Sequence, residues 1–332
     1  MPEALTYRLF EERDLPSLLR LWEEAGWGTL TEEQWREWYV ETPHGACLIT
    51  VAVDGRDEVV AQEMFTPSVV CVGEKEVRAL RFSAPILRQE LQGESLRSGD
   101  HPMINLYKTA AEAAAQQGFS VVYSLPERGW LSIFRLAPRF GVPPFTESDY
   151  ACVSLPIEAK QGGVDNSIRA LADGVAARPV AEFGKEYDEL WLAAKKSFPI
   201  HCGVVRQRDW LRFRNGGRIA VEVRDSLDNS LVGYTATAKK NGVLADILAR
   251  HPRDLERVLA ATLVWFGEER GRSVPEAMTH LKVMRTPVLA LVLENFNGET
   301  LDYKFAFTCN TFDPSLPLEA IAPERWHVMP GD

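Results

Sequence analysis

The run from Val77 to Gly141 constrains the fold more than any other part of the chain. It begins with a strand-like segment, 77–87, which a polar loop with two glycines, 92–100, connects to an alanine-rich helix, 102–117. A short strand, 120–123, and a second helix follow. A glycine-bearing loop between a strand and a helix can hold a phosphate, because the N–H groups and the dipole at a helix N-terminus favour an anion.

The residues before this run predict the first half of the same domain. A strand is expected at 5–10, and two amphipathic helices follow it, the second opened by the capping-box spacing of Thr31-Glu-Glu-Gln34. Strands separated by turns such as Asp54-Gly55 then form an antiparallel meander over 46–87. This order predicts an α/β fold with a mixed sheet (α+β), because it lacks a regular βαβ repeat.

The second half of the chain repeats the order of the first. Two helices precede three strands between 219 and 248, and a long amphipathic helix, 252–270, comes next. A length of 332 residues also favours two domains. The expected division is a first domain at 1–158, a linker at 159–185, a second domain at 186–312 and an extended tail at 313–332.

Charge and cysteine content exclude several classes of protein. The formal net charge is −10 and the pI is near 5.3, which argues against a nucleic-acid partner. The five cysteines are scattered without C-x-x-C spacing, so neither a disulfide framework nor a metal site is expected. The polar N-terminus and the lack of a long apolar run predict a cytoplasmic protein that has no membrane partner.

With that order established, three stretches resemble the GCN5-related N-acetyltransferase (GNAT) superfamily. They are Tyr7–Asp14, the strand, loop and helix of Val77–Gly118, and Tyr123–Gly141. In the second half, Arg208-Asp-Trp-Leu-Arg-Phe213 is similar to the C-terminal domain of double-GNAT proteins. The resemblance implies two tandem GNAT-like acyl-CoA N-acyltransferase domains, with acetyl-CoA or another acyl-CoA as co-substrate.

The resemblance also implies a coenzyme site in the first domain. The fourth strand would bind the pantetheine arm through its backbone, near the end of the fifth strand at Ser124, and the loop would bind the pyrophosphate. That loop has only fragments of the family motif R/Q-x-x-G-x-G/A, so its glycines could equally serve surface turns. The other expected coenzyme residues are Ser83, Ala84, Pro85, Ile86 and Leu87 on the strand, and Gln92, Gly93, Arg97, Ser98 and Gly99 in the loop.

The family's catalytic acid is missing from its expected place. Many members have a tyrosine on the helix after the fifth strand, and the matching residue here is Phe134, which has no proton to donate. Tyr107 and Tyr123 are nearby in sequence, although Tyr123 alternates with residues of a buried strand. Either the acid comes from elsewhere, the thiolate leaves without one, or the domain does not catalyse.

Four further side chains are candidates for the site. Glu63 could act as a base for a substrate amine, or it could be a solvent-facing strand residue. His101 could donate to a phosphate or carry a proton, next to the expected N-cap at Asp100. Arg81 could bind an anionic substrate or belong to the polar face of a strand. Trp130 could form a wall of the substrate pocket, beside Phe134.

The sequence favours an acyltransferase that passes an acyl group, most simply acetyl, from acyl-CoA to the amine of a small molecule or peptide by direct attack. The alternative is a catalytically inactive double-GNAT scaffold that senses a ligand or binds a partner. A third possibility is another donor, such as aminoacyl-tRNA, which the acidic pI disfavours. The second domain lacks a glycine in 249–254 and is expected to serve structure, substrate shape or homodimer formation rather than coenzyme binding.

Overall fold

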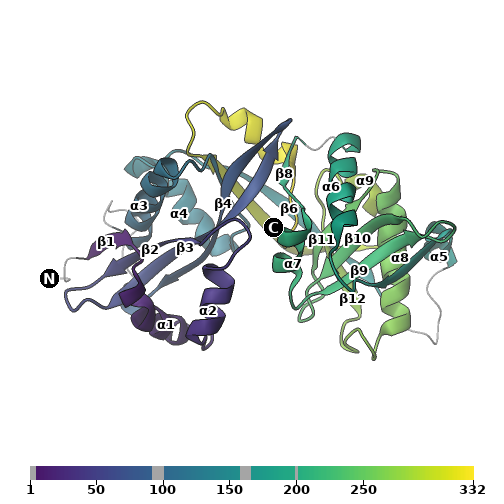
Figure 1. The fold of residues 1–332 in the computed structure, drawn as a ribbon, viewed down its shortest axis with the longest axis horizontal. Coiled ribbons are helices and arrows are strands. Elements are labelled where there is room, and N and C mark those ends of the chain that lie inside the picture. The colour runs from purple at the N-terminus through teal and green to yellow at the C-terminus, as the bar shows by residue number, and fades with distance from the viewer. Residues whose placement is uncertain (1–4, 92–100, 158–165, 199–200) are drawn as a thin grey trace. The chain divides into compact units, whose positions relative to one another are not determined.

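The structure is a computed structural model that describes residues 5–91, 101–157, 166–198 and 201–332. The chain forms two compact units, and each takes in a segment from the far end of the sequence. The first unit is Met1–Ser148 with Ala306–Pro323, and the second is Asp149–Phe305 with Glu324–Asp332. Figure 1 shows the elements along the chain.

The first unit contains a mixed sheet with the order β1-β2-β3-β4-β5-β13. Neighbouring strands are antiparallel except β4 and β5, which are parallel. The last strand enters this sheet through residues 308–311, which pair with β5. The bounds are β1 Thr6–Leu9, β2 Leu48–Val53, β3 Val59–Val72, β4 Lys75–Leu87, β5 Val121–Ser124 and β13 Glu299–Thr311.

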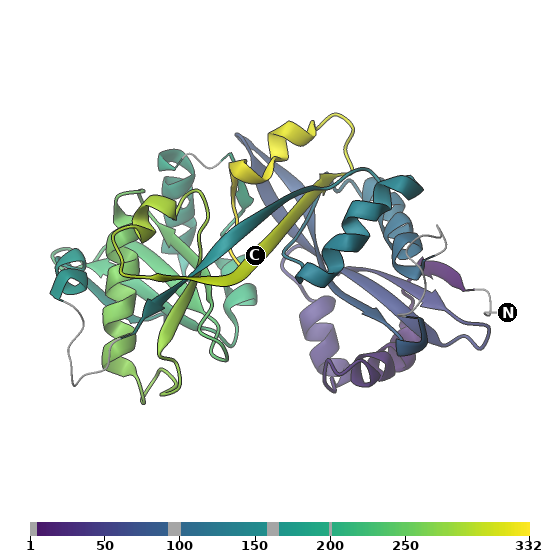
Figure 2. The same ribbon diagram turned by 180° about the vertical axis from the view of Figure 1, so that it is seen from behind.

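Helices cover both faces of this sheet (Figures 1 and 2). One face packs against α1 (Leu15–Glu24) and α2 (Glu32–Tyr39), and the other against α3 (Pro102–Gln116) and α4 (Leu131–Leu136). The predicted capping box is present at α2, where the Gln34 N–H donates to Thr31 Oγ1 at 3.2 Å. Because both faces are covered, side chains on either side of β3 are buried.

The second unit contains an antiparallel sheet with the order β11-β10-β9-β7. Successive residues of β10 face different helices: Gly233 approaches Val258 of α8, and the Tyr234 ring lies 5.7 Å from that of Tyr187 on α6. These elements are β7 Val175–Pro179, β9 Ile219–Asp225, β10 Leu231–Thr237, β11 Leu244–Ala249, α6 Lys185–Ser197 and α8 Asp254–Glu269.

The remaining elements are four further strands, three helices and several 3-10 helices of the described chain. Residues 152–156 of β6 pair with β12, and β8 pairs with β14. Val243 also forms one parallel bridge to Lys282 of β12. The bounds are β6 Thr146–Pro156, β8 Cys202–Val204, β12 His280–Met284, β14 Trp326–His327, α5 Asn166–Leu171, α7 Arg208–Asn215 and α9 Ala290–Leu293. Short 3-10 helices lie at Glu12–Asp14, Gln89–Leu91, Arg128–Trp130, Ala137–Phe140, Leu318–Ile321 and Pro323–Arg325.

The division of the chain differs from the predicted limits of 1–158, 159–185, 186–312 and 313–332. Residues 306–312 lie in the first unit because 308–311 pair with β5. The expected linker contains α5 and β7, and β7 pairs with β9 along its whole length. The expected tail is not an exposed extension, since Ile321, Trp326 and Met329 are buried. Within the predicted meander, residues 59–72 form one continuous strand, β3, which runs through Pro67.

Candidate functional site in the first unit

The parallel strands β4 and β5 separate at the point where the sequence places the coenzyme site. Three positions pair, and the last is Arg81 with Tyr123. At the next position a side-chain hydrogen bond joins the two strands in place of backbone pairing: Ser124 Oγ donates to the carbonyl oxygen of Phe82 at 3.1 Å. Beyond this hydrogen bond, β4 and β5 no longer pair in the described chain, and residues 83–87 of β4 line a cleft.

A bulge in β4 lies directly beyond the separation. Gln62 is paired with Ile86 and Met64 with Ser83, so two residues of β4 lie opposite Glu63. One of the two, Ala84, has φ 45°, in the left-handed region. A bulge of this kind re-aims backbone groups and is common beside active sites.

Gln62 holds the bulge in place from the α1 side. Its Nε2 donates to the Ala84 carbonyl oxygen at 3.1 Å, and its Oε1 accepts from Trp22 Nε1 at 2.9 Å. Gln62 and Trp22 are both buried. Gln62 was not among the predicted site residues, because a lone glutamine within an apolar strand carries no motif.

The separated strands form one wall of a cleft of about 750 Å³. The β4 segment supplies Arg81 to Leu87, and β5 and the residues after it supply Ser124 to Glu127. Two aromatic residues, Trp27 and Trp130, also line the cleft. Of the predicted site residues, Arg81, Ser83, Ala84, Pro85, Ile86, Leu87, His101, Ser124 and Trp130 come together here.

The N-terminus of α3 opens onto this cleft. His101 is the N-cap residue, is 4% exposed, and accepts from the Met103 N–H at Nδ1 over 3.3 Å. His101 therefore caps the helix, a role that the sequence analysis gave to the neighbouring Asp100. Asp100 and the expected pyrophosphate residues Gln92, Gly93, Arg97, Ser98 and Gly99 lie outside the described residues.

Glu63 is buried, which corrects the reading of it as a solvent-facing strand residue. It is 2% exposed and lies on the α3 and α4 face of the sheet. Its Oε2 has no hydrogen-bond partner within the described chain. Burial raises the pKa of this carboxyl well above its usual range, because the charged form loses its hydration.

Glu63 lines a small void of about 10 Å³. Tyr107 of α3 also lines it, and burial together with the nearby Glu63 carboxyl raises the pKa of its phenol. The other lining side chains are apolar: Phe82, Met103, Ile104, Trp130, Ile133, Phe134, Ala137 and Phe145. Phe82, Trp130 and Ile133 line the cleft as well, so the void and the cleft share a wall.

Phe134 occupies a different place from the other predicted substrate residues. It lines the void rather than the cleft, and its ring packs edge-on against Phe82 at 5.6 Å and Phe145 at 4.8 Å. It is 5% exposed. Phe134 therefore belongs to the aromatic core between α3 and α4.

In the second unit, the chain's own C-terminal residues lie against β11. The Gly331 N–H donates to the Ala245 carbonyl oxygen at 2.7 Å, close to the bridge between Val243 and Lys282. Arg206, which is fully buried, bridges Asp246 of β11 at 2.9 Å and Asp332 at 2.7 Å. This edge of β11 is therefore occupied by protein, whereas the matching edge of β4 faces a cleft.

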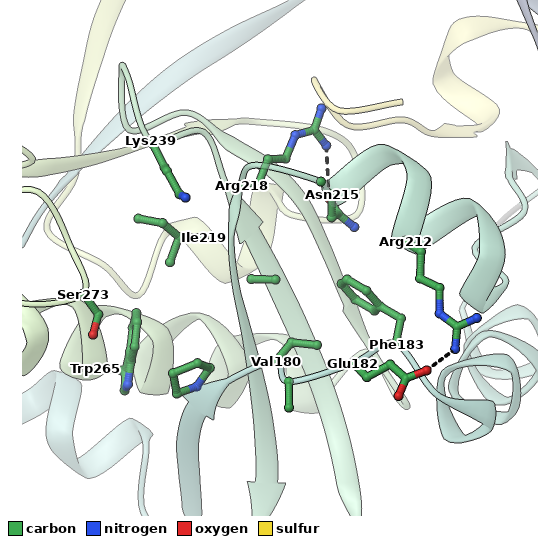
Figure 3. A pocket seen from close by; sticks show the side chains of 14 residues that line it. Val180, Glu182, Phe183, Arg212, Asn215, Arg218, Ile219, Lys239, Trp265 and Ser273 are labelled. Atoms are coloured by element: carbon green, nitrogen blue, oxygen red, sulfur yellow. Dashed lines mark hydrogen bonds and ion pairs between the residues drawn. The ribbon is translucent and has the colours of Figure 1, made fainter. Parts of the chain in front are cut away.

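The second unit has a hollow of its own, of about 520 Å³ (Figure 3). Its lining comes from the β7–α6 loop, the end of α7, the start of β9 and the C-terminal part of α8, represented by Trp265. The lining contains both apolar and charged side chains. Among the charged ones, Arg212 forms an ion pair with Glu182. No residue of 249–254 is among the lining residues within the described chain. The hollow thus lies away from the N-terminus of α8, where a second coenzyme site would be.

No family model and no curated protein sequence matches the chain. Solved structures do match it. A probable N-acyltransferase from Enterococcus faecalis has a TM-score of 0.62 at 12% identity, covering 93% of this chain and 73% of that one. A tandem GNAT protein from the clavulanic acid biosynthesis pathway has a TM-score of 0.52 at 14% identity, covering 94% of this chain and all of that one.

The fold is that of the GNAT proteins. The N-myristoyltransferase of Saccharomyces cerevisiae, solved with bound myristoyl-CoA and inhibitors, is also similar, with a TM-score of 0.57 at 10% identity. It is covered over 80% of its chain, and 94% of this chain is covered. The predicted GNAT-like fold is thereby confirmed. Within the described residues, no helix is long and apolar enough to cross a membrane, and no cluster of potential metal ligands is present.

Proposed function

We propose that the first unit binds an acyl-CoA and transfers its acyl group, most simply acetyl, to the amine of a small molecule or peptide. The observation that carries this proposal is the separation of β4 from β5, with the bulged β4 backbone lining a cleft of about 750 Å³. Unpaired strand edges offer N–H and C=O groups in a row. The amide groups of a pantetheine arm can pair with such a row.

Other parts of the cleft fit the rest of the coenzyme. The N-terminus of α3, at His101, supplies a partial positive charge for phosphate groups. The apolar segment of β4, together with Trp130, surrounds the thioester end. The similarity in fold to N-acyltransferases of several kinds supports the same assignment.

The reaction is a direct displacement. The amine nitrogen attacks the thioester carbonyl carbon, a C–N bond forms, the C–S bond breaks and the coenzyme leaves as a thiolate. The protein's main contribution is to hold the two reactants in contact and to exclude water, which lowers the entropic part of the barrier. The expected base role of Glu63 requires an ionised carboxylate, whereas its buried site favours the acid form.

A non-catalytic acyl-CoA sensor is the second candidate. The observation in its favour is Phe134, which stands at the family's acid position and packs in the aromatic core. Binding and turnover separate the two candidates, because a sensor binds the coenzyme without acylating any amine.

Thermal unfolding with acetyl-CoA and with desulfo-CoA tests the proposal. A ligand at 100 times its Kd stabilises the folded state by about 2.7 kcal/mol, so the midpoint should rise with dose. Gly129→Trp adds a large side chain at a cleft position with open space around the Cβ, and should reduce the shift. Gly184→Trp, in similar open space in the second unit, is the matched control. An unchanged unfolding midpoint at millimolar coenzyme would refute the proposal. A raised midpoint without acylation of any amine would favour the sensor.

A further inference from the structure

Glu63 is the buried titratable group that the proposed reaction leaves without a role. Its Oε2 has no hydrogen-bond partner among the described residues, and none of the side chains that line the void carries a positive charge. The polar groups facing it are the Tyr107 hydroxyl from α3 and the Thr50 hydroxyl from β2, whose residue pairs directly with Glu63. The other side chains that line the void are apolar. An unpaired carboxylate is costly in such surroundings, so the neutral acid is the stable form.

We propose that Glu63 is the proton donor to the leaving coenzyme thiolate, acting through a water held in the void that it shares with Tyr107. This inference rests on the proposed acyl transfer. It supplies the acid that Phe134 cannot provide.

The position of Glu63 fits this role. It lies on β3 opposite the two residues of the β4 bulge, Ala84 and Pro85, which line the cleft. The void of about 10 Å³ is at the lower limit for one water, and Glu63 and Tyr107 give that water two polar partners. Phe82, Trp130 and Ile133 line both the void and the cleft. Movement of one of these side chains on coenzyme binding would open a path for the proton.

Every proton is accounted for over one turnover. The neutral amine adds to the thioester carbonyl and gives a tetrahedral intermediate that is positively charged at nitrogen and negatively charged at oxygen. When this intermediate collapses, the C–S bond breaks and the sulfur takes a proton from Glu63 through the water. The carboxylate that remains accepts the proton lost from the product nitrogen, again through water. Glu63 is neutral once more, and the products are the amide and the free thiol.

The test compares leaving groups. Glu63→Gln preserves the shape of the side chain and removes its acidic proton. With acetyl-CoA, whose alkyl thiolate is basic, the variant should lose about 100-fold or more in kcat, as for other acid catalysts. With an acetyl aryl thioester, whose thiolate needs no proton to leave, the loss should be small. Glu147→Gln, at an exposed ion pair with Arg135, is the control and should match the wild type on both donors.

Two further measurements keep the outcomes apart. The thermal shift with acetyl-CoA must survive in Glu63→Gln, which shows that the variant folds and still binds. An infrared difference spectrum between wild type and Glu63→Gln at pH 7.5 should contain the carbonyl band of a protonated carboxyl. Equal kcat losses on both donors, or a carboxylate band in place of the acid band, would overturn this inference alone. A wild type that neither binds acetyl-CoA nor acylates an amine would instead overturn the proposed function, and this inference with it.

Discussion

Replacing Arg206 by methionine should destabilise the second unit more than most single substitutions. The guanidinium is fully buried and donates to Asp246, to Asp332 and, at 2.8 Å, to the Val204 carbonyl oxygen. Burial raises the pKa of Asp332 to about 6, even with the arginine beside it. Methionine has a similar length, so the substitution removes the charge and leaves two buried carboxyl groups without their partner.

The expected loss in unfolding free energy follows from leaving two buried carboxyl groups without the arginine. Removing one partner of a buried ion pair costs about 3–5 kcal/mol, far more than the pair itself contributes over an apolar replacement. For a unit of this size, each kcal/mol lowers the melting temperature by roughly 2–4 °C. The free energy lost should increase from pH 5 to pH 8, since burial raises the pKa of Asp332 and its protonation relieves the variant at low pH.

Urea unfolding followed by tryptophan fluorescence measures the loss, and hydrogen exchange assigns it to the second unit. The double variant Arg206→Met/Asp332→Asn should lose less than the sum of the single variants, because the pair is coupled. Arg212→Met breaks an exposed pair with Glu182 and should cost about 1 kcal/mol or less. A loss in Arg206→Met below about 1 kcal/mol at pH 7.5, or one that does not vary with pH, would refute the reasoning.

Three other substitutions give distinct results. The pKa of His327 is lowered to about 3, mainly by burial. The stability that comes from burying this imidazole in its neutral form is therefore present above pH 6.5 and is lost as the pH falls. Between pH 7 and pH 5 the wild type should lose about 2 kcal/mol of unfolding free energy through this histidine, and His327→Gln should not show that loss. Urea titration at each pH measures the difference. In Gly233→Ala, the new Cβ would lie 2.4 Å from the Leu248 carbonyl oxygen, and we expect a loss of about 2 kcal/mol or more in the same assay. Gly184→Ala, which meets nothing within 4 Å, should be near neutral. Ser124→Ala removes the hydrogen bond to Phe82 and should cost about 1 kcal/mol. It should also weaken the thermal shift with acetyl-CoA, and an unchanged shift would separate Ser124 from the coenzyme site.

Local chemistry made part of the fold predictable. The capping box at Thr31 and the helix that begins at Pro102 follow from patterns within a few residues, and both are present. The order of strands and helices was likewise sufficient to predict the GNAT fold. The pairing of β13 with β5 could not be predicted, because it joins residues almost 190 positions apart and periodicity does not name a strand's partner.

The burial of Glu63 was missed for a related reason. Alternation along a strand identifies two faces, but it does not show which face meets solvent. Here α1 and α2 cover one face and α3 and α4 the other, so a polar residue in β3 has no exposed side to occupy. The C-terminal residues were misread as an exposed tail because the buried partner of Asp332, Arg206, is distant in sequence.

The different surroundings of the edges of β4 and β11 give a physical reason why coenzyme binding is proposed for the first unit and not for the second. A strand edge that leaves its neighbour exposes N–H and C=O groups, and these need partners when they are buried. At β4 the bulge keeps that edge turned to a cleft, with Gln62 bonded to the Ala84 carbonyl and Ser124 to the Phe82 carbonyl. At β11 the Gly331 N–H binds the Ala245 carbonyl, and glycine is required because a Cβ would lie 2.4 Å from that same oxygen. Any ligand competing for β11 would have to displace the C-terminal residues and leave Arg206 without Asp332. The cost of an unpaired buried charge therefore opposes coenzyme binding in the second unit, whereas the cleft of the first unit carries no such cost.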